Sequence, residues 1–249
     1  MAIRLVISGC CGKMGSTIAA LAHPSLLAGG IETKGHPAIG RDLGEVVSGK
    51  ALGVKVTDDA AAALEQGNVL IEFTTPEATM EHLQVAFSLK KAMVIGTTGL
   101  SDMNQQLIAK ASESIPIVFS PNMSVGVNVL FELVQIAAEQ LSPSYAVKII
   151  EKHHKHKKDK PSGTAKRLHE LIANVRSRWK LSTDIPESIR EGEVVGDHTV
   201  IFSTPFERVE LTHHAETRDV FAVGAIEAAK FVAEQPPGLY DMSHVLRQT

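Results

Sequence analysis

A short run of β-branched and apolar residues opens the chain, ends at a glycine-rich loop and leads into an alanine- and leucine-rich stretch that continues to about residue 28. The same order, strand then loop then helix, recurs along the first half of the sequence. Runs of the strand type lie at 3–7, 69–73, 93–95 and 115–119. Continuous apolar runs of this length are typical of strands buried on both faces of a parallel sheet. We therefore predict an α/β fold with a doubly wound parallel sheet in the N-terminal part.

The pattern changes after about residue 124. We expect a helix to about 141, a strand at 145–153, a helix from 161–162 to about 179, antiparallel strands at 199–202 and 209–212, and a last helix at about 221–234. This mixture predicts a smaller α+β domain with a mixed or antiparallel sheet over 125–224, after a first domain over 1–124. The C-terminal helical region, about 225–249, is expected to return to the first domain.

Composition narrows the class of protein. The 249 residues are 44% hydrophobic and 21% charged, which excludes a disordered or collagen-like chain. The net charge of −3 and the aromatic content of 4% favour neither nucleic acid nor an acidic membrane as a partner. The two cysteines are neighbours, and no apolar run reaches the roughly 18 residues of a membrane helix. We expect a soluble, cytoplasmic protein without a signal peptide.

Gly9, Gly12 and Gly15 lie where the first strand passes into the first helix. Glycines there allow a tight turn and the close approach of a pyrophosphate, and the helix N-terminus behind them attracts anions. Glu32 stands about 20 residues further on, where dinucleotide-binding folds place the carboxylate that binds ribose hydroxyls. The Glu32 carboxylate would repel the 2′-phosphate of NADPH, and the charge of Lys34 would partly offset this repulsion. The pattern predicts a Rossmann-like cofactor domain, although a tight turn before a packed helix is the alternative.

A second cluster combines five lysines and three histidines within residues 152–160. If the preceding strand continues, alternation divides the side chains between two faces, with His153, Lys155 and Lys157 on one and His154 and His156 on the other. A proton-transfer group and a cation would then share one side. The sequence at 161–164 opens a helix, which adds an anion-binding N-terminus. Together these features predict a pocket for a small polyanion.

Three other interpretations of this cluster stay open from the pattern alone. It could be a solvated basic loop. It could be a metal site on His154 and His156, although the lysines would repel a dication and no third ligand is evident. It could also be a nucleic-acid patch, although no recognition motif is present.

These motifs together resemble the 4-hydroxy-tetrahydrodipicolinate reductase family, also called the dihydrodipicolinate reductases. The resemblance runs nearly from end to end, and the lysine- and histidine-rich motif is highly specific. The matching segments are 9–15 (G-x-x-G-x-M-G), 96–99 (G-T-T-G), 120–128 (S-x-N-x-S-x-G-V-N), 151–165 (E-x-H-H-x-x-K-x-D-x-P-S-G-T-A), 196–198 (G-D-H) and 211–215 (L-T-H-x-A).

The resemblance implies an enzyme that reduces a small cyclic dicarboxylate with NADH or NADPH, in diaminopimelate and lysine biosynthesis. Hydride comes from the nicotinamide, water is lost, no metal takes part, and the protein is a homotetramer. The family's functional positions fall on catalytic His153 and Lys157, on substrate-binding His154, Gly163 and Thr164, and on cofactor-binding Gly9, Cys10, Cys11, Gly12, Lys13, Met14, Glu32, Gly96, Thr97, Thr98, Ser120, Pro121, Asn122 and Met123.

Two departures from the family pattern bear on these expectations. Thr33 stands where the family often has an arginine that can meet a 2′-phosphate, which leaves the choice between NADH and NADPH open. The segment at 180–190 is short, and the family's longer loop there helps to assemble the tetramer. Other functions in view are an NAD(P)-dependent oxidoreductase for a different carboxylate and a nicotinamide-sensing regulator. We expect His198, His213 and His214 to be structural.

Overall fold

The computed structural model describes residues 2–247. The chain forms two units, Met1–Ser124 with Asp219–Thr249 (unit 1) and Val125–Arg218 (unit 2). It thus leaves unit 1 after Ser124 and returns at Asp219, compared with expected boundaries at 124 and 224. The functions expected of the two parts remain predictions.

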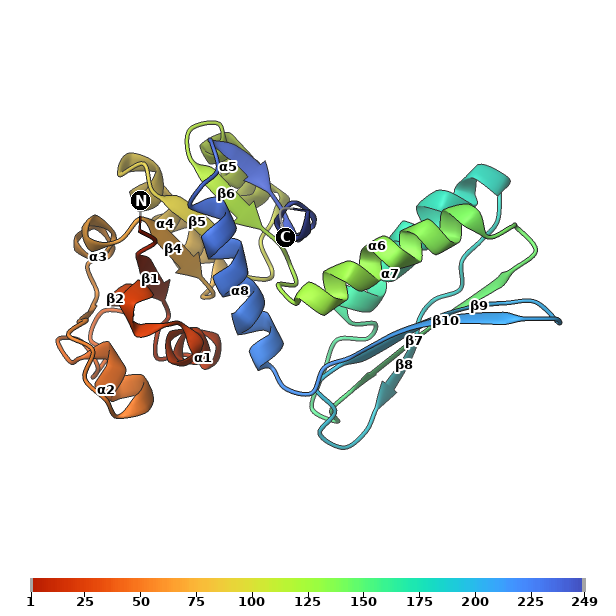
Figure 1. The fold of residues 1–249 in the computed structure, drawn as a ribbon, viewed down its shortest axis with the longest axis horizontal. Helices are drawn as coiled ribbons and strands as arrows, with labels where there is room; N and C mark the ends of the chain where they lie inside the picture. Colours follow the sequence, from red (N-terminus) through yellow and green to blue (C-terminus); the bar gives the residue numbers. More distant parts are fainter. Residues whose placement is uncertain (1, 248–249) are drawn as a thin grey trace. The chain divides into compact units, whose positions relative to one another are not determined.

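Unit 1 is built on a seven-stranded sheet in which every pair is parallel (Figure 1). The spatial order is β11-β6-β5-β4-β1-β2-β3, so the chain reverses direction across the sheet between β1 and β4. This topology confirms the predicted Rossmann-like, doubly wound sheet. The strands are β1 (Leu5–Ser8), β2 (Leu27–Ile31), β3 (Val56–Thr57), β4 (Val69–Glu72), β5 (Ala92–Ile95), β6 (Pro116–Phe119) and β11 (Gly238–Tyr240).

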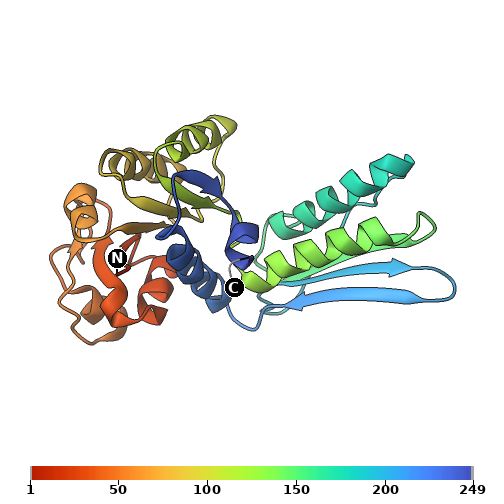
Figure 2. The same cartoon turned by 45° about the horizontal axis from the view of Figure 1, so that its top comes forward.

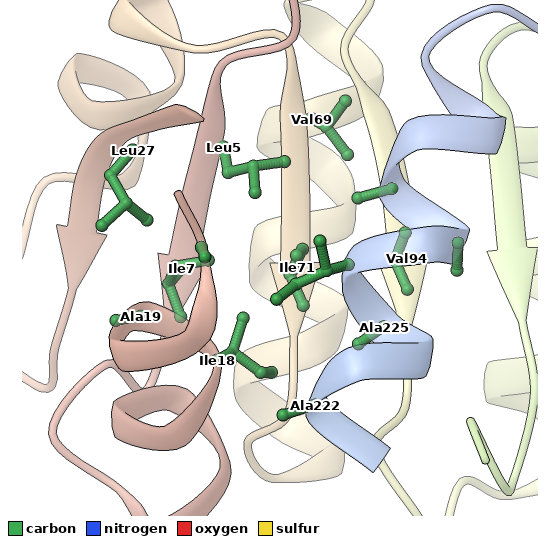
Figure 3. Packing of buried hydrophobic residues seen from close by; sticks show 14 of the residues in the cluster. Leu5, Ile7, Ile18, Ala19, Leu27, Val69, Ile71, Val94, Ala222 and Ala225 are labelled. Carbon is green, nitrogen blue, oxygen red and sulfur yellow. The ribbon is translucent and has the colours of Figure 1, made fainter. Parts of the chain in front are cut away.

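Helices cover both faces of this sheet. They are α1 (Lys13–Leu21), α2 (Leu43–Ser48), α3 (Ala60–Gln66), α4 (Pro76–Ser88), α5 (Asp102–Ser112), α8 (Asp219–Val232) and α9 (Met242–Leu246), with a 3₁₀ turn at Pro24–Leu26. Alternate strand residues point to opposite faces. Leu5 and Ile7 therefore pack with α1 and α8, as Figure 3 shows, whereas Val6 packs against the face covered by α3, α4 and α5.

The first helix is shorter than the sequence suggests. It ends at Leu21 rather than near residue 28, and β2 begins at Leu27. Pro24 explains the difference, because its ring fixes φ and removes the N–H that a continuing helix needs. The pattern also fails to indicate β3 and β11, which have two and three residues and therefore show no periodicity.

Unit 2 is a four-stranded mixed sheet with two long helices on one face (Figure 2). Its strands, in the order β10-β9-β7-β8, are β7 (Ala146–His153), β8 (Glu187–Arg190), β9 (Asp197–Ser203) and β10 (Arg208–His214). Its helices are α6 (Val125–Gln140) and α7 (Gly163–Arg176), followed by a 3₁₀ turn at Ser177–Trp179. Only the β7–β8 pair is parallel within this sheet, which agrees with the predicted mixed sheet. Within residues 2–247, none of the helices combines the length and the apolar character of a membrane span.

One glycine of α8 sets how closely this helix approaches the loop after β6. A Cβ built on Gly224 would lie 1.7 Å from the carbonyl oxygen of Met123. The obstacle is backbone, which cannot move aside as a flexible side chain would. The position of the loop at 120–123 therefore depends on a glycine far away in sequence.

We predict that Gly224→Ala destabilises the protein by about 1–3 kcal/mol, because the added methyl forces helix and loop apart. Thermal unfolding followed by circular dichroism measures the change. Gly163→Ala is the matched control, since a Cβ there meets no atom within 4 Å. Equal melting temperatures for the two variants would contradict this account of α8.

Candidate active site

The glycine loop of unit 1 forms a tight turn between β1 and α1. Gly9 has a φ of +60°, and its carbonyl accepts a hydrogen bond from the Gly12 N–H (2.9 Å). A Cβ on Gly15 would lie 2.1 Å from the same carbonyl oxygen. Gly12 caps α1 without a side-chain hydrogen bond, which leaves the helix end to its own backbone N–H groups. This cradle fits a pyrophosphate.

Glu32 follows β2 and is turned toward the glycine loop. Its Oε1 accepts the N–H of Cys11 (2.8 Å), and its Oε2 accepts the N–H of Thr33 (3.2 Å). The carboxylate is therefore held beside the loop by two backbone donors. This position fits the ribose-binding role expected of Glu32, while Lys34 is exposed.

The remaining predicted cofactor residues lie after neighbouring parallel strands. Gly96, Thr97 and Thr98 follow β5, and the segment 120–123 follows β6. The carboxyl ends of parallel strands meet at one edge of the sheet, so these loops gather at the edge that carries the glycine loop. Thr97 Oγ1 accepts hydrogen bonds from the Thr74 N–H (3.2 Å) and from the Thr79 hydroxyl (2.8 Å). Unit 1 thus brings the predicted cofactor residues to the edge where ligands bind in open α/β sheets.

Two groups of possible metal ligands occur among the described residues. Cys10, Cys11 and Glu32 offer ligand atoms within 4.8 Å of one another. Burial raises the pKa of both thiols. The second group is Glu151, His153 and His198, where a guanidinium already holds both oxygens of Glu151.

The strand expected to carry the lysine- and histidine-rich cluster ends at its first histidine. After His153 the backbone turns: the Lys157 N–H donates to the carbonyl of His154 (3.1 Å), and the N–H of His154 donates to the carbonyl of Val194 (2.7 Å). The strand does not continue, so the sharing of faces that a continuing strand would give His153, Lys155 and Lys157, and His154 and His156, does not apply. The backbone after His153 forms hydrogen bonds with the loop at 192–194 and not with a neighbouring strand.

Glu151 is the centre of the polar cluster in unit 2. It is fully buried on β7 and accepts two hydrogen bonds from the Arg190 guanidinium, at 2.9 and 2.7 Å. It also accepts the N–H of Ser162 (3.3 Å) and pairs with Nδ1 of His153. Burial alone would raise the pKa of this carboxyl, but the hydrogen bonds from Arg190 and His153 lower it to about 2. Glu151 is therefore an anion at any physiological pH.

His153 is buried, and its two ring nitrogens have different surroundings. Nδ1 faces the carboxylate of Glu151, so the neutral ring carries its proton there. Nε2 is then left to accept a proton and, once protonated, to donate it. A Cβ on Gly196 would lie 3.0 Å from Nε2, so a side chain at 196 would crowd this atom. Burial lowers the pKa of His153, opposed by Glu151 and assisted by the charges of Lys157 and Arg190.

The other predicted substrate residues lie in the loop after β7 and in the first turn of α7. Lys157 Nζ pairs with Asp159 Oδ1 (2.9 Å) and is close enough to His153 to lower its pKa. His154 Nε2 lies 3.2 Å from a guanidinium nitrogen of Arg218. Gly163 and Thr164 form the first turn of α7, behind the N-cap Ser162. Cations and a helix N-terminus together make a site for an anion.

Sequence reasoning named neither Arg190 nor Glu151 as a site residue, gave Ser162 only as part of the helix opening, and left His198 as structural. Ser162 caps α7, accepting the Ala165 N–H (3.2 Å), and its hydroxyl also contacts Nε2 of His198 (3.2 Å). Burial lowers the pKa of His198 to about 3, so this ring is neutral. The pairing of β7 with β8 sets Arg190 opposite His153, and no local pattern reveals a register between strands so far apart. Strand alternation, in contrast, places Glu151 on the face of His153.

Comparisons with known proteins agree on one family. The chain matches "Dihydrodipicolinate reductase, N-terminus" over residues 3–123 and "Dihydrodipicolinate reductase, C-terminus" over residues 126–246. It is 44% identical to a 4-hydroxy-tetrahydrodipicolinate reductase of Anaeromyxobacter dehalogenans, covering 98% of this chain and 97% of the relative. It is 41% identical to one of Syntrophus aciditrophicus, covering 98% of both.

Solved structures share the fold at lower identity. A dipicolinate-bound dihydrodipicolinate reductase from Paenisporosarcina sp. TG-14 superposes with a TM-score of 0.79 at 23% identity, covering 97% of this chain and 98% of that one. An amine dehydrogenase from Mycobacterium smegmatis gives 0.63 at 14% identity, covering 96% and 94%. The full-length similarity of the curated relatives shows that this chain belongs to the 4-hydroxy-tetrahydrodipicolinate reductase family.

Proposed function

We propose that this protein reduces 4-hydroxy-tetrahydrodipicolinate to tetrahydrodipicolinate with NADH or NADPH, in diaminopimelate and lysine biosynthesis. The observation that carries the proposal is the buried His153, with Nδ1 held by Glu151, near Lys157. A cyclic dicarboxylate needs cations and backbone donors around it and a proton donor at its ring. Unit 2 supplies these groups, and curated relatives over the whole chain bear the name of this activity.

His153 is the proposed proton donor. Glu151 accepts a hydrogen bond from the Nδ1–H group of His153, so this proton stays in place. The proton that is transferred is the one on Nε2. When bound, the nicotinamide supplies the hydride. Burial favours the neutral ring in the free protein, and a dianion bound beside it would raise the pKa of His153. Substrate binding therefore promotes the protonated form that the reaction consumes.

Lys157, His154 and the first turn of α7, which contains Gly163 and Thr164, are the proposed carboxylate-binding groups. A hydrogen bond assisted by charge contributes about 1.5–3 kcal/mol, so a few of them suffice to hold a small dianion. Lys157 also lies near enough to His153 to influence its pKa. It is therefore the proposed catalytic partner as well as a cation for the substrate.

The loops at the carboxyl edge of the unit 1 sheet are proposed to bind the cofactor. The glycine turn fits the pyrophosphate, and Glu32, with both oxygens anchored, fits the ribose hydroxyls. A fixed carboxylate at that place repels a 2′-phosphate. The geometry therefore favours NADH over NADPH as the reductant.

The cytoplasmic location and the homotetramer expected from the family belong to this proposal. One strongly exposed aromatic residue of unit 2 is available to a partner copy. The Phe206 side chain, in the turn between β9 and β10, is 95% exposed. Burial of such a ring against another copy would stabilise an assembly.

Turnover is the direct test of the function. The substrate is generated in place from pyruvate and aspartate semialdehyde by the preceding synthase, and oxidation of NADH and NADPH is followed in parallel by absorbance. We expect oxidation that requires the synthase product. Folded protein that binds NADH but oxidises none would instead favour an oxidoreductase for another carboxylate.

We predict that Lys157→Ala lowers kcat by about 10²-fold or more, because it removes a charge near the proton donor and the substrate. The matched control is Lys158→Ala in the same loop, whose side chain is exposed. That variant loses an equal charge and should keep nearly normal turnover. Similar losses in both variants would show that general basicity, and not Lys157 itself, supports the reaction.

We predict that Glu32→Gln raises KM for NADH and reduces the preference for NADH over NADPH, since the amide no longer repels a 2′-phosphate. Steady-state kinetics with both cofactors measures the ratio of their kcat/KM values. Lys34→Gln, two residues away and exposed, is the control for a change of surface charge. An unchanged ratio in Glu32→Gln would remove this residue from the choice of cofactor.

A further inference from the structure

We infer that Arg190 and Glu151 are positioning residues for the reaction, a single buried ion pair that fixes the proton donor, the Lys157 loop and the anion-binding end of α7 together. This inference rests on the proposed function. It concerns residues that touch none of the reacting atoms and act through their neighbours.

Arg190 is bound on several sides. Its two terminal nitrogens donate to the two oxygens of Glu151, at 2.9 and 2.7 Å. The same nitrogens donate to the carbonyl of Ile189 (2.8 Å) and to the carbonyl of Asp159 (2.6 Å). The side chain of Arg190 is only 7% exposed. A planar fork with fixed donors can make this set of bonds, whereas a lysine ammonium cannot.

The bond to Asp159 ties the pair to the Lys157 loop. The backbone of Asp159 is held by Arg190, and its carboxylate pairs with Lys157 Nζ at 2.9 Å. Lys157 is thus two residues from the anchored carbonyl of Asp159, and it forms an ion pair with the Asp159 side chain. Loss of the fork would free this loop at its centre.

Glu151 extends the same pair to the proton donor and to α7. Its Oε2 pairs with Nδ1 of His153, and its Oε1 accepts the N–H of Ser162, the N-cap of α7. Ser162 in turn contacts Nε2 of His198 through its hydroxyl. The N-terminus of α7, which is proposed to bind a substrate carboxylate, is therefore hydrogen-bonded to Glu151. The same Glu151 side chain orients His153, the proposed proton donor.

Because the charges around His153 set its pKa, loss of the ion pair should change the pH dependence of activity. The groups that face the ring are Glu151 on β7, Lys157 in the following loop, Arg190 on β8 and His198 on β9. Glu151 is the anion that raises the pKa of His153, while burial, Lys157 and Arg190 lower it. Removal of the Glu151 charge therefore moves the titration of His153 to lower pH.

Glu151→Gln and Arg190→Lys are the variants that test the inference. The first keeps shape and loses charge, and the second keeps charge and loses the fork. For both we expect kcat to fall by about tenfold or more, KM for the dicarboxylate to rise, and the dissociation constant of NADH, which is bound by unit 1, to change by less than about twofold. In Glu151→Gln the pH limb of His153 in kcat/KM should also shift downward.

Glu191→Gln is the matched control, because it breaks an exposed ion pair with Lys152 beside the same strands (3.2 Å) and should leave these quantities unchanged. Folded variants with wild-type kcat, or a Glu151→Gln profile with an unshifted limb, would overturn the inference. If Glu151→Gln does not fold, Arg190→Lys decides through kcat and KM. If the wild-type protein turned over no dicarboxylate, the proposed function would fail, and NMR titration of His153 in the variants would still test the positioning.

Discussion

The ion pair between Glu151 and Arg190 is the constraint on which the arrangement of unit 2 depends. A carboxylate removed from water costs several kcal/mol, and this one is compensated by a two-pronged guanidinium, a backbone N–H and an imidazole. Buried ion pairs contribute little net stability compared with well-packed apolar residues, although breaking one by removing a partner costs about 3–5 kcal/mol. Its value here lies in orientation, because the pair joins β7, β8, the Lys157 loop and the start of α7. Such a pair gives His153 one tautomer and a defined charge environment.

Unit 1 is proposed to have a different task, which is to bring backbone groups rather than charged side chains close to a ligand. Its central strands β1, β4 and β5 are buried on both faces, so their side chains alternate between the layer of α1 and α8 and the layer of α3, α4 and α5. The loops that leave the carboxyl edge are then free to carry function. Close contacts at Gly15 and Gly224 fix two of these loops through backbone packing alone. The carboxylate of Glu32, held by two N–H groups, adds a negative charge beside the glycine loop, and we propose that this charge discriminates between cofactors.

Much of this architecture is predictable from the sequence, and the failures have physical reasons. Runs such as 69–73 and 93–95 predict buried strands, and the doubly wound topology results from their alternation with helices. The alanine- and leucine-rich composition makes the predicted first helix too long, because it outweighs the single helix-breaking residue Pro24. The cluster at 152–160 and the end of its strand near residue 153 are recognisable, but the turn beyond His153 is not, because hydrogen bonds to the loop at 192–194 shape it. Arg190 escapes prediction because its role arises from a strand pairing that joins residues 153 and 190.

The most direct test of the role of Glu151 and His153 is a nitrogen NMR titration of the histidines. It is done with and without pyridine-2,6-dicarboxylate, a stable analogue of the proposed substrate. We predict that His153 keeps its proton on Nδ1 in the neutral form and titrates at Nε2. Its pKa should lie below the usual histidine value in the free protein, where burial dominates, and should rise when the dianion binds. A neutral ring protonated on Nε2, or a pKa unmoved by the dianion, would contradict the claim that Glu151 holds His153 as the proton donor beside a dicarboxylate site.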